Sequence, residues 1–154
     1  MSKSLNVEVT VLATLHDEHG VEFHCTWPDD SGTWHSGPIE FPSGASKNKV
    51  KFKLEDRSGL ELQFLDQPDD AIWFDATGCP SSGNGNDLGQ IKDKTVEKDP
   101  VSSKRKKLTL TNLNTQECSL HYALRFTSKA AQSGGQQPLY VCDPELRNRG
   151  GGTA

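Results

Sequence analysis

The stretch from Lys107 to Thr127 reads KLTLTNLNTQECSLHYALRFT, and apolar and polar residues alternate on both sides of a polar break at 112–117. In the second run, one face carries Cys118, Leu120, Tyr122, Leu124 and Phe126. A period of two is typical of a strand with one buried face. The break is rich in turn-forming residues. The stretch therefore predicts an antiparallel hairpin whose long second strand is central in a sheet.

The same alternation recurs in the first third of the chain. Within residues 6–16, every second position is apolar (Val7, Val9, Val11, Ala13 and Leu15), and Val21–Trp27 resumes the pattern after a turn that ends at Gly20. Lys49–Leu54 then alternates lysines with apolar residues. These segments predict a first hairpin, followed by a strand with a charged outer face.

Taken together, these patterns predict an all-β fold. About eight to ten short strands, with turns at short intervals and no convincing helical period, favour an antiparallel β-sandwich of Greek-key, immunoglobulin-like type. A partly open β-barrel is the alternative. We expect a single domain over residues 1–146 and a flexible, glycine-rich tail over 147–154.

Charge and composition restrict the partners. The chain has 154 residues, a net charge of −4 and a pI near 5.7, whereas a nucleic-acid-binding domain is usually basic. Its one basic run, Lys104–Lys107, is short, and we interpret it as a solvated entry to a strand. With no long apolar run and no apolar leader at the start, we expect a soluble, cytoplasmic protein that contacts neither nucleic acid nor membrane, with all four cysteines reduced.

The sequence contains no convincing catalytic or metal-binding motif. Cys25 and Cys118 fall on apolar strand faces, where a thiol is buried and inert. A blue-copper site is disfavoured because Cys118 and His121 lie three apart in one strand, hence on opposite faces, and the chain's one methionine is Met1. We therefore predict no catalytic residues, no metal and no cofactor.

The strongest candidates for contact with a ligand are aromatic residues beside polar loops. Loops at the ends of a sandwich commonly carry binding residues, and tryptophan is enriched at binding hot spots. Trp27 continues an apolar strand face, so we interpret it as a cap on the core. The predicted ligand or partner contacts are Trp34, His35, Trp73, Asp70 and Asp75.

These observations favour a non-catalytic binding or assembly module that uses loops at one end of a sandwich. Its ligand is a partner protein or a small molecule of unknown identity, and the edge strands leave room for a homodimer. Two alternatives stay open. One is a small metal-binding protein or hydrolase that uses His and Asp residues of the loops, and the other is a carbohydrate-binding module.

Overall fold

The computed structural model describes residues 4–16, 20–29, 31–80, 83–128 and 139–153, with only the backbone at residue 16 and at 139–144. Strands make up nearly all of its regular structure, and one helical turn interrupts them. The elements are β1 (Asn6–His16), β2 (Gly20–Pro28), β3 (Trp34–His35), β4 (Ile39–Phe41), β5 (Asn48–Arg57), β6 (Leu62–Phe64), α1 (Pro68–Ala71), β7 (Ile72–Asp75), β8 (Ile91–Lys98), β9 (Arg105–Asn112), β10 (Glu117–Ser128) and β11 (Leu139–Arg149).

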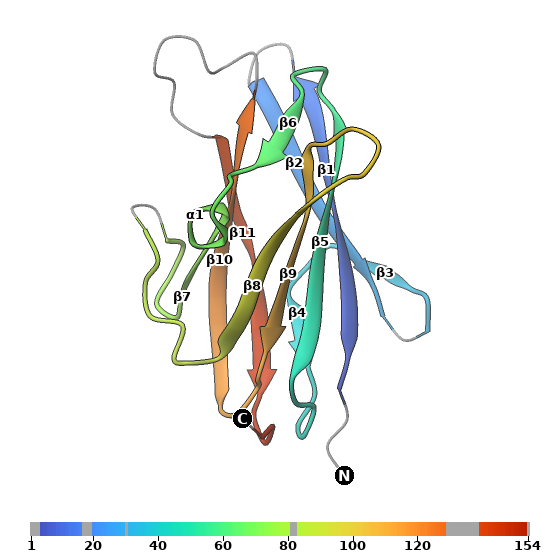
Figure 1. Cartoon of the computed structure of the whole chain (residues 1–154). Coiled ribbons are helices and arrows are strands. Elements are labelled where there is room, and N and C mark those ends of the chain that lie inside the picture. The colour runs from blue at the N-terminus through green and yellow to red at the C-terminus, as the bar shows by residue number, and fades with distance from the viewer. Residues whose placement is uncertain (1–3, 17–19, 30, 81–82, 129–138, 154) are drawn as a thin grey trace.

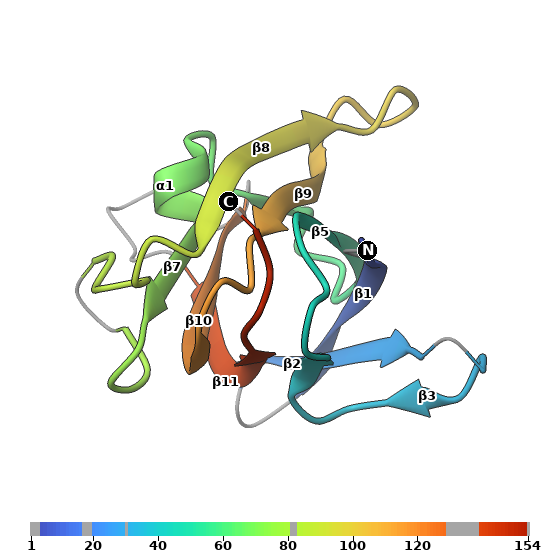
Figure 2. The same cartoon turned by 90° about the horizontal axis from the view of Figure 1, so that it is seen from below.

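The strands form two sheets that face each other (Figures 1 and 2). One sheet has the order β3-β2-β1-β5-β9-β8; the other has the order β4-β11-β10-β6, with β7 also paired to β10. The all-β sandwich is thus confirmed. The sheets are mixed rather than wholly antiparallel, because β1 pairs with β5 and β4 pairs with β11 in parallel. The β1–β2 hairpin forms as predicted.

The prediction of a hairpin over Lys107–Thr127 is wrong. Its two strands, β9 and β10, lie in different sheets, and the segment between them crosses from one sheet to the other. Alternation predicts which face of a strand is buried, but it does not predict which strand lies beside it in the sheet. Two successive strands with buried faces can pair in one sheet, or they can lie in two facing sheets and share the core between them. The second strand, β10, does lie inside its sheet, between β11 on one side and β6 and β7 on the other.

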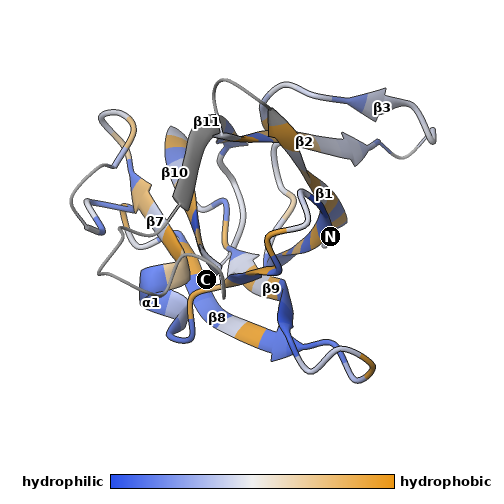
Figure 3. Ribbon diagram, turned by 90° about the horizontal axis from the view of Figure 1, so that it is seen from above, coloured by the Kyte–Doolittle hydropathy of each residue, from blue (hydrophilic) through white to orange (hydrophobic). Residues whose placement is uncertain are grey.

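Aromatic side chains from both sheets fill the core. Tyr122 lies edge-on to Phe52, with ring centroids 5.2 Å apart, and Phe126 stacks on Phe23 at 5.0 Å. Each pair joins β10 to a strand of the other sheet, so the apolar face predicted for β10 does form the centre of the sandwich. Figure 3 shows the matching alternation of hydrophobic and hydrophilic residues along β1.

Buried asparagines close one end of the sandwich. The side-chain amides of Asn112 in β9 and Asn148 in β11 donate to each other's oxygen at 2.7 and 3.0 Å, which links the two sheets. Asn114 donates to the carbonyls of Pro42 and Ala45 and accepts from the N–H of Gly150. The sequence suggested a tail from 147, but β11 continues to Arg149, and Gly152 donates to the Asn114 carbonyl.

The basic run at the start of β9 connects the sheets rather than facing solvent. Lys104 pairs with Glu61 at 3.0 Å, and Lys106 donates to the carbonyl of Leu62 at 2.7 Å. The Arg105 side chain donates to the carbonyl of Phe64 at 2.7 Å. The interpretation of Lys104–Lys107 as a solvated entry to a strand is therefore corrected. Lys104, Arg105 and Lys106 hold the short strand β6 against β9.

The expectation that all four cysteines are reduced is also corrected, because Cys79 is disulfide-bonded. Cys25 and Cys118 are not disulfide-bonded, and burial raises the pKa of the Cys118 thiol, in keeping with an inert cysteine. Within the described residues, no helix has the length and apolar character needed to span a bilayer.

Candidate functional site

A short hairpin of β2 and β3 projects from the side of the molecule opposite α1 and β7 (Figures 1 and 2). The Asp29 carboxylate organises its turn: Oδ1 accepts the backbone N–H groups of Ser31 and Thr33 at 2.9 and 3.0 Å. Oδ2 lies 2.7 Å from Nε2 of His35. The bond with His35, followed by that with the Ser31 hydroxyl, holds the pKa of Asp29 far below its ordinary value. An ionised Asp29 thus holds both strands of the hairpin.

The aromatic residues of this hairpin pair across it. Trp27 lies opposite His35 and Pro28 opposite Trp34. The indole of Trp27 stacks on the imidazole of His35, with centroids 4.7 Å apart and an interplanar angle of 27°, and its N–H donates to the carbonyl of Gly37 at 3.1 Å. Trp34 stays 59% exposed. The hairpin therefore fixes the Trp27–His35 stack in position before any ligand binds, and the next residue of β3, Trp34, adds an exposed indole.

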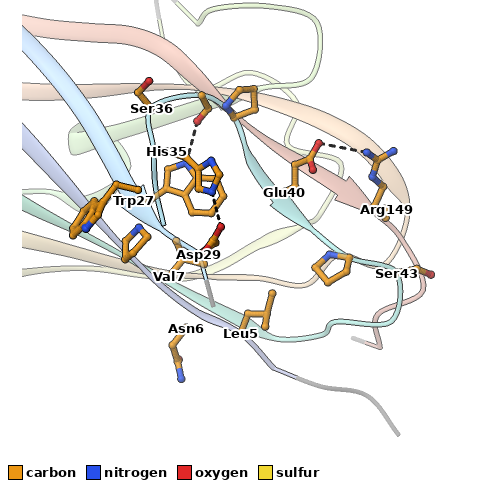
Figure 4. Close-up of a pocket in the computed structure, with 15 residues that line it drawn as sticks. Leu5, Asn6, Val7, Trp27, Asp29, His35, Ser36, Glu40, Ser43 and Arg149 are labelled. Carbon is orange, nitrogen blue, oxygen red and sulfur yellow. Dashed lines mark hydrogen bonds and ion pairs between the residues drawn. The ribbon is translucent and has the colours of Figure 1, made fainter. Parts of the chain in front are cut away.

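These side chains line a groove of about 1000 Å³. Its other walls come from the start of β1, from the segment around β4 and from the end of β11, and they include Leu5, Asn6, Val7, Pro38, Glu40, Pro42, Ser43 and Arg149. Arg149 pairs with Glu40 at 3.4 Å. Figure 4 shows this pair and the His35–Asp29 pair in one view of the groove. The groove thus combines aromatic and proline surface with paired charges.

Long-range contacts fix the wall that faces the hairpin. Pro42 is held through its carbonyl by the buried amide of Asn114, and the main chain just after Arg149 is held by the same residue. Gly44 N–H also donates to the carbonyl of Gly150 at 3.0 Å. The asparagine end of the core therefore positions residues of the groove that come from β4 and β11.

The other predicted contacts lie elsewhere. Trp73 is in β7, and the guanidinium of Arg125 lies 3.9 Å from the centroid of its ring. Arg125 also donates to the backbone carbonyl of Asp70 at 2.9 Å. The Asp75 carboxylate accepts the backbone N–H and the hydroxyl of Thr77, and these bonds lower its pKa. The structure therefore divides the predicted set, with Trp34 and His35 in the groove and the other three around β7.

Sequence reasoning missed several residues of the groove. Trp27 was interpreted as a core cap; it does pack against the core, but it also lines the groove. The turn formers between Trp27 and His35, with Asp29 first and Gly32 at a φ of 85°, were a usable signal for a hairpin. Glu40 and Arg149 were missed because only the fold brings them together.

Across the part of the chain that the structure describes, no group of three or more His, Cys, Asp or Glu side chains is placed to hold a metal ion. His35 and Asp29, the closest pair of this kind in the groove, are bonded to each other.

Comparison with known proteins gives no family assignment. No known protein family matches the chain, and no curated protein matches it in sequence.

Proposed function

We propose that this protein is a non-catalytic binding module whose ligand site is the groove beside β3. The observation that carries the proposal is the aromatic surface of the β2–β3 hairpin, which combines the fixed Trp27–His35 stack with the exposed indole of Trp34. Trp34 is 59% exposed on a hairpin whose turn is fixed by Asp29 and whose strands are joined by the Trp27–His35 stack. Binding to a rigid aromatic surface costs little conformational entropy, and tryptophan is frequent at binding hot spots.

The environment of the groove supports the same function. An isolated exposed apolar side chain needs no explanation, but here Trp34 lines a concavity together with Trp27, Pro28 and Pro38. Concave sites with apolar walls and a few placed polar groups are the usual form of ligand sites. The residues around Trp73 differ, because Arg125 covers that indole and the nearby carboxylate of Asp75 is engaged in its own turn.

A binding screen tests the proposal. Labelled protein is applied to arrays that carry both peptides and glycans, and each hit is remeasured with Trp34→Ala, His35→Ala and Leu15→Ala. Leu15 is 53% exposed and does not line the groove, so it controls for the loss of an exposed apolar side chain. We expect hits that are weakened by the first two changes and unaffected by the third. Hits whose affinity is the same in Trp34→Ala and wild type would contradict the groove as the site.

The disulfide at Cys79 also bears on the compartment in which the protein works. The sequence favoured a cytoplasmic protein, whereas a disulfide at Cys79 favours an oxidising compartment. Binding of a partner protein, including a second copy of the chain, is one form that the proposed function can take, and the peptide arrays test the case in which the partner contributes a linear segment.

A further inference from the structure

Each carboxylate in the groove already has a polar partner. Asp29 bonds to His35 at 2.7 Å, and Glu40 lies 3.4 Å from Arg149 and 3.8 Å from Arg147. A charged group of a ligand would have to compete with one of these contacts, because a cation would displace His35 from Asp29 or Arg149 from Glu40, and an anion would displace Glu40 from Arg149. This arrangement favours a ligand without net charge.

The strand edges beside the groove are poorly suited to adding a peptide strand. β3 has two residues and β4 has three, and Pro38 and Pro42 flank β4. Short edge strands and prolines oppose strand addition, because proline has no N–H to donate. Side chains, rather than a backbone ladder, must therefore recognise the ligand.

Side-chain recognition of a proline-rich peptide is also disfavoured. Aromatic grooves that bind such peptides need donors for the peptide's carbonyl groups, since the polyproline II backbone forms no hydrogen bonds of its own. The indole N–H of Trp27 already donates to the carbonyl of Gly37 at 3.1 Å, so a proline-rich peptide that packed on the Trp27–His35 stack would find no indole donor there.

The side chains that remain suit a polyhydroxylated ring. Glu40 keeps its second carboxylate oxygen as an acceptor, Arg149 keeps the N–H groups that do not face Glu40 as donors, and Asn6, Ser36 and Ser43 can both donate and accept. Sugar hydroxyls both donate and accept, and the C–H face of a pyranose packs on the negative face of an aromatic ring. We infer that the ligand of this groove is a neutral carbohydrate, an inference that rests on the proposed binding function.

Affinity electrophoresis tests the inference. Native gels contain a neutral β-glucan, a xylan or a galactomannan, and a proline-rich decapeptide is titrated in parallel by fluorescence anisotropy. We expect at least one polysaccharide to retard the wild type and Leu15→Ala, and Trp34→Ala to weaken this binding by about tenfold or more. Glu40→Gln, which keeps an acceptor, should weaken it less than Glu40→Ala. Raising NaCl from 0.05 to 0.5 M should change the affinity by less than about twofold, as for an uncharged ligand.

The outcomes separate the two claims. Binding of the decapeptide alone, lost in Trp34→Ala, would overturn the carbohydrate inference and leave the groove as the binding site. Retardation by a polysaccharide that is equal in Trp34→Ala and wild type would overturn both. No binding to any of the three polysaccharides would overturn the carbohydrate inference. Steep weakening by salt would overturn the neutral character of the ligand.

Discussion

At the scale of single residues, uncharged side-chain amides link the two sheets. Asn112 and Asn148 are 0% and 2% exposed, and their side chains bond to each other across the two sheets. A buried amide that loses its partner keeps the cost of its desolvation. These side chains therefore determine how the sheets are aligned at this end, where the wall of the groove is also held.

Asn148→Ala should destabilise the fold by roughly 1–3 kcal/mol, because the amide of Asn112 is left buried without this partner. Urea unfolding followed by circular dichroism measures the change. The double variant Asn112→Ala/Asn148→Ala should cost less than the sum of the two single variants, since the two residues act as one unit. Additive costs would show that the pair is not coupled.

Asp29 provides a prediction about pH. Its pKa is lowered in the folded protein, chiefly by the bond with His35, and in the unfolded chain it takes an ordinary value near 3.9. The contribution of Asp29 to stability is therefore present above about pH 3.9 and is lost only as the pH falls through the lower, folded pKa. Carboxyl carbon NMR should show Asp29 still ionised at about pH 3.

His35→Ala provides the control for this titration. Without the imidazole, the pKa of Asp29 should rise toward its ordinary value, because the largest cause of its lowering is removed. A wild-type carboxyl signal that titrates near 3.9, or one that His35→Ala leaves in place, would refute the role of this pair in closing the hairpin.

At the scale of elements, short strands depend on side chains from their neighbours. β6 has three residues and pairs with the end of β10, while cations from the start of β9 bond to its carbonyl groups. Asp56 supports the same corner by accepting the N–H of Leu62 at 2.8 Å. Burial acts to raise the pKa of this carboxyl, but its hydrogen bonds with Ser58 and Leu62 outweigh burial and lower it.

Lys106→Ala should destabilise the protein by roughly 1–2 kcal/mol, because the carbonyl of Leu62 loses its charged donor. Lys53→Ala is the matched control, since Lys53 is an exposed lysine of β5, and it should stay within about 0.5 kcal/mol of wild type. Both are measured by chemical denaturation. Equal effects of the two substitutions would mean that the basic run does not connect the sheets.

At the scale of the whole molecule, residue alternation predicted the buried faces but not the pairing of strands. Tyr122 and Phe126 lie in the core as expected. The predicted pairing of β9 with β10 was wrong, because a period of two shows which face of a strand is buried but not which strand lies beside it. The groove was partly predictable from exposed aromatic residues beside turn formers. Arg149 was not, because it is 109 residues from Glu40 and only the closed sandwich joins them.

The disulfide at Cys79 is a second property of the whole chain that strand patterns do not predict. The chain has four cysteines, of which Cys25 and Cys118 are not disulfide-bonded. Thiol titration of the unfolded, unreduced protein should therefore find two reactive thiols per chain, and a reductant should lower the melting temperature, since disulfides typically contribute about 2–4 kcal/mol. Four thiols, or a melting temperature indifferent to reductant, would contradict the disulfide.

The central claim is that the groove beside β3 is the ligand site, and the three tryptophans test it most directly. Their indole N–H signals in a proton–nitrogen NMR spectrum report on the exposed Trp34, on Trp27 within the hairpin, and on Trp73 beneath Arg125. On titration with oligosaccharides from the polysaccharide that retards the protein, or with the decapeptide if it alone binds, the Trp34 signal should shift most and the Trp73 signal should stay fixed. A shift of Trp73 with Trp34 unchanged would contradict the account.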